Sequence, residues 1–172
     1  MLSFLRCSTG KQELRADFNA FVFVSFSIVV LLSLTEGQLV IKHYELCGGK
    51  GTIKWIKVTP CVQEPCRFAR NTKINVEMEA DFEKPSKTVT MSSIAKVGDT
   101  NMTLVGTPTD FCKAKIVVCP VKGKGDFRTV KFIVPIKKFY TPNPYNATFQ
   151  GYGDSGREIC VRLLIYVLDE MI

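Results

Sequence analysis

The feature that most constrains the fold is an alternation of apolar and polar residues in several short stretches. It is clearest in INVEMEADF (residues 74–82), where Ile, Val, Met, Ala and Phe alternate with Asn, Glu, Glu and Asp. Successive side chains of a β-strand point to opposite faces, so this stretch predicts a strand with one buried and one acidic face. Similar stretches, rich in β-branched and aromatic residues, lie at residues 52–59, 87–95, 128–136, 145–152 and 160–168. These stretches predict an all-β fold of about six or seven short strands, which favours an antiparallel β-sandwich.

The first 37 residues contain an apolar run, FNAFVFVSFSIVVLLSL (residues 18–34). Lys11 and Arg15 precede this run, and small residues follow it, with Gly37 as the expected last residue before cleavage. The segment predicts a secretory signal peptide over residues 1–37 and leaves residues 38–172 as one domain. A retained membrane anchor is the alternative, because a run of this length just reaches the lower limit for a spanning helix. Under both interpretations the rest of the chain crosses a membrane.

The cysteine pattern fits a chain that has crossed a membrane into an oxidising compartment. Of seven cysteines only Cys7 lies in the leader, and an even number in an oxidising lumen predicts a disulfide framework. A zinc site is disfavoured, because the paired cysteines are spaced Cys-x4-Cys and Cys-x6-Cys and His43 is the only histidine. A redox pair would need Cys-x-x-Cys, which the sequence lacks. In TPCVQEPC (residues 59–66) the two prolines favour a turn that brings the two cysteines within bonding distance.

Two tripeptides of the Asn-x-Thr type begin at Asn101 and Asn146. Both are acceptor sequences for N-linked glycans in a secreted chain, and we predict them as glycosylation sites. Because Asn146 falls within a predicted strand, its side chain would have to point away from the core.

The string Gly153-Asp154-Ser155-Gly156 also surrounds the nucleophilic serine of trypsin-like proteases. Such a serine needs a histidine as base, and His43 lies in a segment unlike that of these proteases. Glycine and aspartate are also typical of a hairpin turn, which is what we predict here. The sequence shows no phosphate-binding glycine loop and no recognisable pair of catalytic carboxylates. We therefore predict no enzyme activity, no cofactor and no metal.

A basic stretch lies in the second half of the chain, whose formal net charge is +7. Its members are Lys113, Lys115, Lys122, Lys124, Arg128, Lys131, Lys137 and Lys138. Nucleic acid is not expected as the partner of a secreted, disulfide-bonded domain. Two interpretations remain open, a solvated surface and a surface that contacts anionic lipid head groups, where each basic residue contributes about 1 kcal/mol.

The order of motifs resembles the ML lipid-recognition family, and most of all its Niemann-Pick type C2 branch of secreted sterol-binding proteins. The segments that carry the resemblance are YELCGGKGTIKWIKVTPCVQEPC, FCKAKIVVCPVKGKGDF, FIVPIKKFYTPNP and REICVRLLIYV, in this order. The similarity covers the chain from about Tyr44 to its C-terminus. It implies an immunoglobulin-like sandwich of two antiparallel sheets that separate to admit a lipid. It also implies the disulfides Cys47–Cys160, Cys61–Cys66 and Cys112–Cys119.

The resemblance further implies which residues line the lipid pocket. The positions that match residues lining or gating the pocket are Val58, Leu104, Ile136 and Tyr140, and Pro135 shapes the strand beside them as a further lipid-binding position. Along the last predicted strand, Val161, Leu163, Ile165 and Val167 share one face and would point inward. For each of these residues plain core packing is the alternative role. The loop AKVGDTNMTLVGTPTD around Leu104 is longer and poorer in proline than in the family. The resemblance therefore does not fix the identity of the ligand.

By this resemblance, the chain is a monomeric carrier in the extracellular space or the lysosomal lumen. It would bind a cholesterol-like sterol or another small lipid in intracellular sterol transport, in transient contact with anionic membranes and a membrane sterol transporter. The alternative with the same fold is an innate-immune protein that presents bacterial glycolipid or another lipid to a receptor. An empty pocket of ~300 Å³ would cost about 7 kcal/mol, so we expect the unliganded pocket to be small or partly collapsed.

Overall fold

The computed structural model describes residues 37–169 of the chain. The predicted signal peptide, except for its last residue, lies outside the described residues. In sequence order the strands are β1 (Leu39–Val40), β2 (Glu45–Leu46), β3 (Ile53–Thr59), β4 (Cys66–Ala69), β5 (Thr72–Ala80), β6 (Thr90–Val97), β7 (Thr100–Thr103), β8 (Arg128–Ile136), β9 (Asn143–Gly153) and β10 (Gly156–Leu168). No helix within residues 37–169 is long and apolar enough to cross a membrane.

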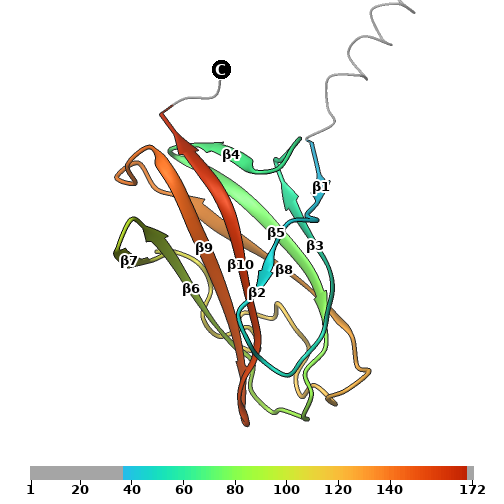
Figure 1. Cartoon of the computed structure of the whole chain (residues 1–172). Helices are drawn as coiled ribbons and strands as arrows, with labels where there is room; N and C mark the ends of the chain where they lie inside the picture. Colours follow the sequence, from blue (N-terminus) through green and yellow to red (C-terminus); the bar gives the residue numbers. More distant parts are fainter. Residues whose placement is uncertain (1–36, 170–172) are drawn as a thin grey trace, which may run out of the picture. The chain divides into compact units, whose positions relative to one another are not determined.

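The strands form two sheets, which face each other as layers (Figure 1). Sheet A has the order β1-β3-β5-β8, and sheet B has the order β2-β10-β9-β6-β7. All of these pairs are antiparallel, and β4 adds one parallel pair to β10 in sheet B. The predicted all-β sandwich is therefore confirmed, with a parallel edge pairing that the alternation could not reveal.

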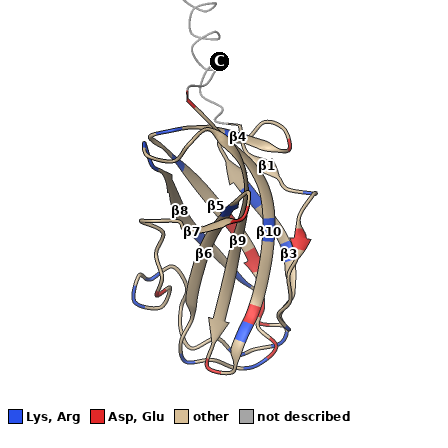
Figure 2. Cartoon of the chain, turned by 60° about the vertical axis from the view of Figure 1, so that its left-hand side comes forward, with Lys and Arg blue, Asp and Glu red and all other residues tan. Residues whose placement is uncertain are grey.

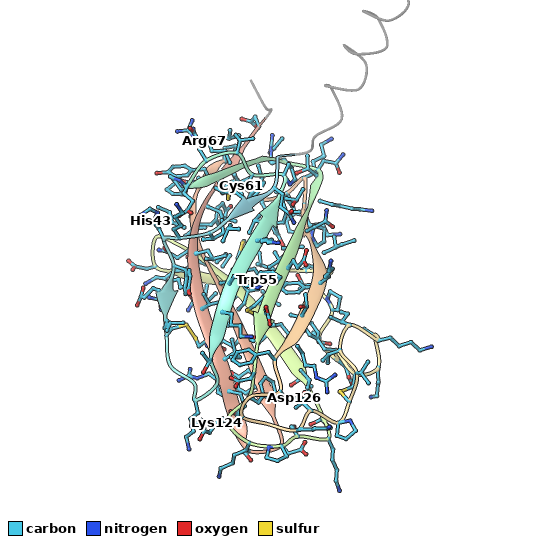
Figure 3. All side chains as sticks on the ribbon, turned by 90° about the vertical axis from the view of Figure 1, so that its right-hand side faces the viewer. His43, Trp55, Cys61, Arg67, Lys124 and Asp126 are labelled. Carbon is cyan, nitrogen blue, oxygen red and sulfur yellow. A yellow bond between two sulfur atoms is a disulfide. The ribbon has the colours of Figure 1, made fainter. Side chains whose placement is uncertain are left out.

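Each predicted stretch forms a strand, and the alternation matches burial. In β5 the side chains of Ile74, Val76 and Met78 are buried, whereas Glu77 and Glu79 lie on the outer face of sheet A. The outer face of β3 carries Trp55 (Figure 3), whose indole N–H donates to Glu79 Oε2 at 2.6 Å. Burial of the apolar face, at about 25 cal/mol per Å² removed from water, holds the two sheets together.

The strand predicted at residues 87–95 begins later, at Thr90. The reason is the carboxylate of Asp154, which accepts hydrogen bonds from the backbone N–H groups of Lys87 and Thr88 at 2.8 and 3.2 Å. These two backbone N–H groups therefore do not take part in the hydrogen bonds between strands. The strands β1, β2, β4 and β7 were not predicted, because two to four residues are too few to show an alternation.

Three disulfides join Cys47 to Cys160, Cys61 to Cys66 and Cys112 to Cys119, the pairing that the family resemblance implies. Their Cα–Cα distances are 5.0, 5.4 and 5.7 Å. The first ties the segment after β2 to the middle of β10, across 113 residues of sequence. The second closes the short loop between β3 and β4. The third lies within the long connection between β7 and β8.

Candidate functional site

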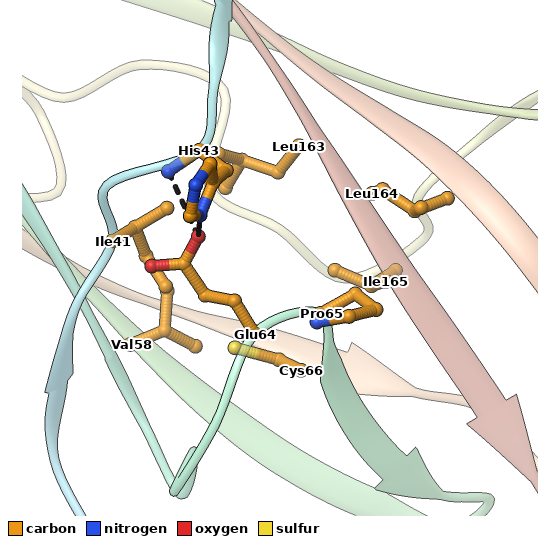
Figure 4. A pocket seen from close by; sticks show the side chains of 9 residues that line it. All are labelled: Ile41, His43, Val58, Glu64, Pro65, Cys66, Leu163, Leu164 and Ile165. Carbon is orange, nitrogen blue, oxygen red and sulfur yellow. Dashed lines mark hydrogen bonds and ion pairs between the residues drawn. The ribbon is translucent and has the colours of Figure 1, made fainter.

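A cavity of about 160 Å³ lies between the two sheets at the edge formed by β1, β3, β4 and β10 (Figure 4). Its lining is mostly apolar, with two ionisable side chains. The lining residues are Ile41, His43, Val58, Glu64, Pro65, Cys66, Leu163, Leu164 and Ile165. Val58 comes from sheet A, whereas Leu163 and Ile165 point inward from β10 of sheet B, so the cavity belongs to the space between the layers.

The cavity opens where the outer edge of sheet B is interrupted. On this side of β10, β2 pairs with Val161 and Arg162, and β4 pairs with Ile165 and the residues after it. Leu163 and Leu164 lie between these two short strands and pair with neither of them. Pro65, directly before β4, has no backbone N–H and cannot extend the ladder toward them. The interruption is therefore built into the sequence of the β3–β4 loop.

The polar part of the rim is centred on Glu64. Its Oε1 accepts a hydrogen bond from the backbone N–H of Lys42 at 2.6 Å, and its Oε2 accepts one from the backbone N–H of His43 at 2.8 Å. The Nδ1 atom of His43 lies 2.7 Å from the same Oε2 (Figure 4). Partial burial by itself would raise the pKa of Glu64, but the bonds from Lys42 and His43 outweigh it and lower the pKa of this carboxyl. Glu64 is therefore ionised at neutral pH and pins the segment that connects β1 and β2.

A second, smaller cavity of about 40 Å³ lies elsewhere between the sheets. Apolar side chains of β5, β6 and β8 line it, together with residues from the connection between β7 and β8. Asp81 at its border is buried, and its two carboxylate oxygens accept hydrogen bonds from the backbone N–H groups of Thr52 and Gly125 at 2.8 and 2.7 Å. Both oxygens thus have a bonding role within the fold, and this cavity offers little room for a ligand.

The structure divides the predicted pocket residues into two groups. Val58, Leu163 and Ile165 line the larger cavity, and Val161 and Val167 are buried on the same face of β10. The second group, around the end of β8, lines neither of the two cavities. Its members are Leu104, Pro135, Ile136 and Tyr140, of which all but the half-buried Pro135 are buried. A ligand-binding role for the second group remains a prediction.

Tyr140 illustrates why the second group is closed. Its side chain is 1% exposed, and its hydroxyl accepts a hydrogen bond from the backbone N–H of Val105 at 3.1 Å. Burial raises the pKa of this phenol, against the opposing effect of the Val105 bond. The bond joins the loop after β7 to the loop after β8. In this structure the Tyr140 hydroxyl therefore ties two loops together and does not stand at an open mouth.

Sequence reasoning missed the rim of the cavity. Glu64 lies within the segment that predicted a disulfide turn, and His43 was considered only as a zinc ligand or a protease base. Neither residue carries a local motif, because the partners that Glu64 binds are 21 and 22 positions away in sequence. Only Pro65, which cannot donate a backbone hydrogen bond, signals in the sequence that the sheet edge is interrupted there.

The predicted hairpin turn at the Gly-Asp-Ser-Gly string is confirmed, since β9 ends at Gly153 and β10 begins at Gly156. Gly156 has a φ of +104°, a conformation that glycine adopts readily. Ser155 lies in the turn before β10, and Leu163 lies seven positions along that strand from Gly156, which is ~23 Å at about 3.3 Å per residue. Since His43 lies at the cavity beside Leu163, the structure does not assemble a protease-like pair.

The basic stretch does not form one uniform cationic surface, and acidic residues are interspersed with it (Figure 2). Four of its members lie within 4.0 Å of a carboxylate oxygen: Lys113, Lys124, Arg128 and Lys131. Exposed ion pairs of this kind contribute little to stability. Within residues 37–169 no group of three or more His, Cys, Asp or Glu side chains is placed to hold a metal ion.

The predicted glycan acceptors lie close together on sheet B. Asn101 in β7 and Asn146 in β9 are both register partners of Lys96 in β6, one on either side of it. Both asparagine side chains are exposed, as glycan attachment requires. Glycosylation at these two positions stays a prediction, and glycans there would cover the outer face of sheet B.

Comparison with known proteins matches residues 42–167 to a family model described as the ML domain. Two mite proteins are similar in sequence. The mite group 2 allergen Gly d 2.02 of Glycyphagus domesticus is 28% identical over 114 residues, covering 66% of this chain and 89% of the relative. The mite group 2 allergen Lep d 2 of Lepidoglyphus destructor is 28% identical over 135 residues, covering 78% and 89%.

Among solved structures, the crystal structure of a Niemann-Pick type C2 protein from Japanese carpenter ant is similar, with a TM-score of 0.66. The alignment covers 74% of this chain and all of that chain, at 19% sequence identity. At this identity the likeness shows that the two chains share a fold.

Proposed function

The chain belongs to the ML domain family of lipid-binding proteins, and from this we propose that it carries a sterol or a similar small lipid between its two sheets. The observation that carries the proposal is the apolar cavity of about 160 Å³ between the layers, whose polar side chains lie at its rim. The protein performs no chemistry on the ligand. Its work is desolvation, at about 25 cal/mol for each Å² of hydrocarbon surface removed from water.

The bound lipid needs more room than this cavity offers, because pockets for ligands of this size usually measure ~300–1,000 Å³. A fully enclosed empty volume of 160 Å³ would cost about 3.8 kcal/mol at ~24 cal/mol per Å³, and a larger one more, which favours a small unliganded pocket. We propose that the sheets move apart as the ligand enters. Side chains deeper in the interior, such as Leu104, Ile136 and Val161, would then contact it, with Pro135 and Tyr140 beside them. The three disulfides keep the edges of the fold connected during this movement.

Delivery to an anionic membrane has a candidate surface at the loop after β8. Lys137 and Lys138 precede Phe139, whose side chain is 66% exposed, and the exposed Val105 belongs to the loop that is bonded to Tyr140. Basic residues beside exposed apolar ones suit a transient contact with lipid head groups. In keeping with its disulfides and its relatives, we place this carrier outside the cytoplasm, in the extracellular space or a lysosomal lumen.

Binding of a fluorescent sterol to the delipidated protein tests the proposal, with saturation at one ligand per chain as the expected result. The substitutions Val58→Gln and Ile136→Gln place a polar side chain inside the interlayer space and should abolish this binding. Ile133→Gln is the matched control, because Ile133 lies on the same strand as Ile136 but is 46% exposed. Unchanged binding in both interior variants would refute the assignment of the site.

Mass spectrometry of lipids that copurify from the native source separates sterol transport from recognition of bacterial lipid. A bound sterol supports the carrier proposed here. An acylated glycolipid would instead indicate an innate-immune recognition protein with the same fold.

A further inference from the structure

The interrupted edge of sheet B and the Glu64 carboxylate lie at the same opening. We propose that the end of an aliphatic chain enters the cavity through this opening, between β2 and β4, and that Glu64 selects lipids whose head group donates a hydrogen bond over lipids with an anionic head group. The inference rests on the proposed lipid-binding function and adds to it an entrance and a head-group class.

The opening is suited to an entrance because no strand pairing has to break for it to widen, and the only polar contacts named at its rim are those of Glu64 with Lys42 and His43. Leu163 and Leu164 have no ladder partner in β2 or β4, so an incoming chain does not have to separate paired strands there. On one side of the opening, β2 contributes only two residues to the sheet, and on the other side β4 begins at Cys66.

The volume of the cavity indicates which part of a lipid it takes. An engineered cavity of ~150 Å³ lined by Leu, Ile and Phe binds benzene, so a cavity of about 160 Å³ accepts a hydrocarbon group of about six carbon atoms. That is the end of an alkyl chain and not a fused ring system. A flexible chain end can enter first, and the rest of the ligand can follow as the sheets separate.

Apolar side chains outside the opening support this direction of entry. Four large apolar residues are exposed on the segments that border it: Val40 (44%), Leu46 (64%), Val62 (80%) and Leu164 (45%). Leu164 itself lines the cavity. Val40 and Val62 lie one and two positions from the lining residues Ile41 and Glu64, and Leu46 belongs to β2. An alkyl chain that approaches this edge would meet apolar surface before it reaches the interior.

The bonding of Glu64 determines which head group it favours. A carboxylate can accept about four hydrogen bonds. Lys42 occupies one acceptor position on Oε1, and the backbone N–H and Nδ1 of His43 lie at Oε2. One acceptor position on Oε1 is therefore left for a ligand that donates, such as an alcohol. A second carboxylate at the rim would be repelled by ~1–4 kcal/mol at a separation of 4 Å, depending on the local dielectric.

The test compares dodecan-1-ol with dodecanoate, which share one chain length and differ in the head group. Titration calorimetry with the delipidated protein at neutral pH is expected to show at least about fivefold tighter binding of the alcohol. Glu64→Gln should reduce this preference to about twofold or less. Glu45→Gln is the matched control, because Glu45 lies on the same edge but pairs with Arg162 and does not line the cavity. It should leave the preference unchanged.

A second variant keeps the test decisive if Glu64→Gln disturbs the β1–β2 connection. Val58→Phe fills the cavity from the opposite sheet and should abolish binding of dodecan-1-ol. Equal or tighter binding of dodecanoate by the unmodified protein, or a preference that Glu64→Gln leaves intact, would overturn the inference. If the protein binds a sterol but Val58→Phe does not affect dodecan-1-ol, the proposed function stands and the inference falls. If it binds neither a sterol nor dodecan-1-ol, the proposed function itself is refuted.

Discussion

Filling the larger cavity should raise stability and abolish ligand binding at the same time. The substitution Val58→Phe places a benzene ring into a cavity of about 160 Å³, close to the ~150 Å³ that accommodates free benzene. The empty volume costs at most about 3.8 kcal/mol. Imperfect fit of a larger side chain usually costs ~1–3 kcal/mol. We therefore expect the free energy of unfolding to increase by about 1–2 kcal/mol.

Denaturant unfolding measures this change, and the fluorescence of Trp55, the only tryptophan of the chain, reports the transition. Ile136→Phe is the control, because Ile136 is buried but lines neither cavity. It should lower the free energy of unfolding by about 1–3 kcal/mol, as overpacking of a filled core does. If Val58→Phe lowers stability as much as Ile136→Phe, the space beside Val58 is already filled and the reasoning is refuted.

Three further outcomes are expected. Replacing both Cys47 and Cys160 by alanine should lower the free energy of unfolding by about 5 kcal/mol. Removing either short-range disulfide should lower it by ~2 kcal/mol. Denaturant unfolding of the three variants measures this difference. Tyr140→Phe removes the partner of the Val105 backbone N–H and should cost about 0.5–1.5 kcal/mol in the same assay. The absence of a measurable loss would contradict this role. Folding lowers the pKa of Glu64 from 4.5, so the contribution of Glu64 to stability is present above pH 4.5 and is lost as the pH falls through the lower, folded-state pKa. In the Glu64→Gln variant, the free energy of unfolding should therefore decrease less steeply as the pH is lowered below 4.5.

Much of the fold was predictable because the relevant physics is local. Alternation along β5, β8 and β10 follows from burying one face of each strand, and the structure buries the residues that the alternation assigns to that face. The Gly-Asp-Ser-Gly turn depends on a few adjacent residues and was likewise predictable. Strand limits were less accurate where a distant group intervenes, as the Asp154 carboxylate does at the start of β6.

The disulfide pairing shows what local sequence can predict and what it cannot. Local spacing sufficed for Cys61–Cys66, but Cys47–Cys160 spans 113 residues and was implied only by the resemblance to a family. The same holds for the second group of predicted pocket residues. The resemblance implied a gate around Tyr140, whereas the hydrogen bond of Tyr140 to Val105 depends on how two loops meet in this particular chain.

By itself the sequence determined an all-β chain with one buried face per strand, because each strand encodes its own two faces in the order of its residues. The tertiary structure alone decided where space remains between the sheets. A cavity is a difference between the volume that two sheets enclose and the volume that their side chains fill, and no single segment contains both terms. In the same way, Glu64 became the centre of a rim only when folding brought it to Lys42 and His43, which supply the hydrogen bonds that lower its pKa.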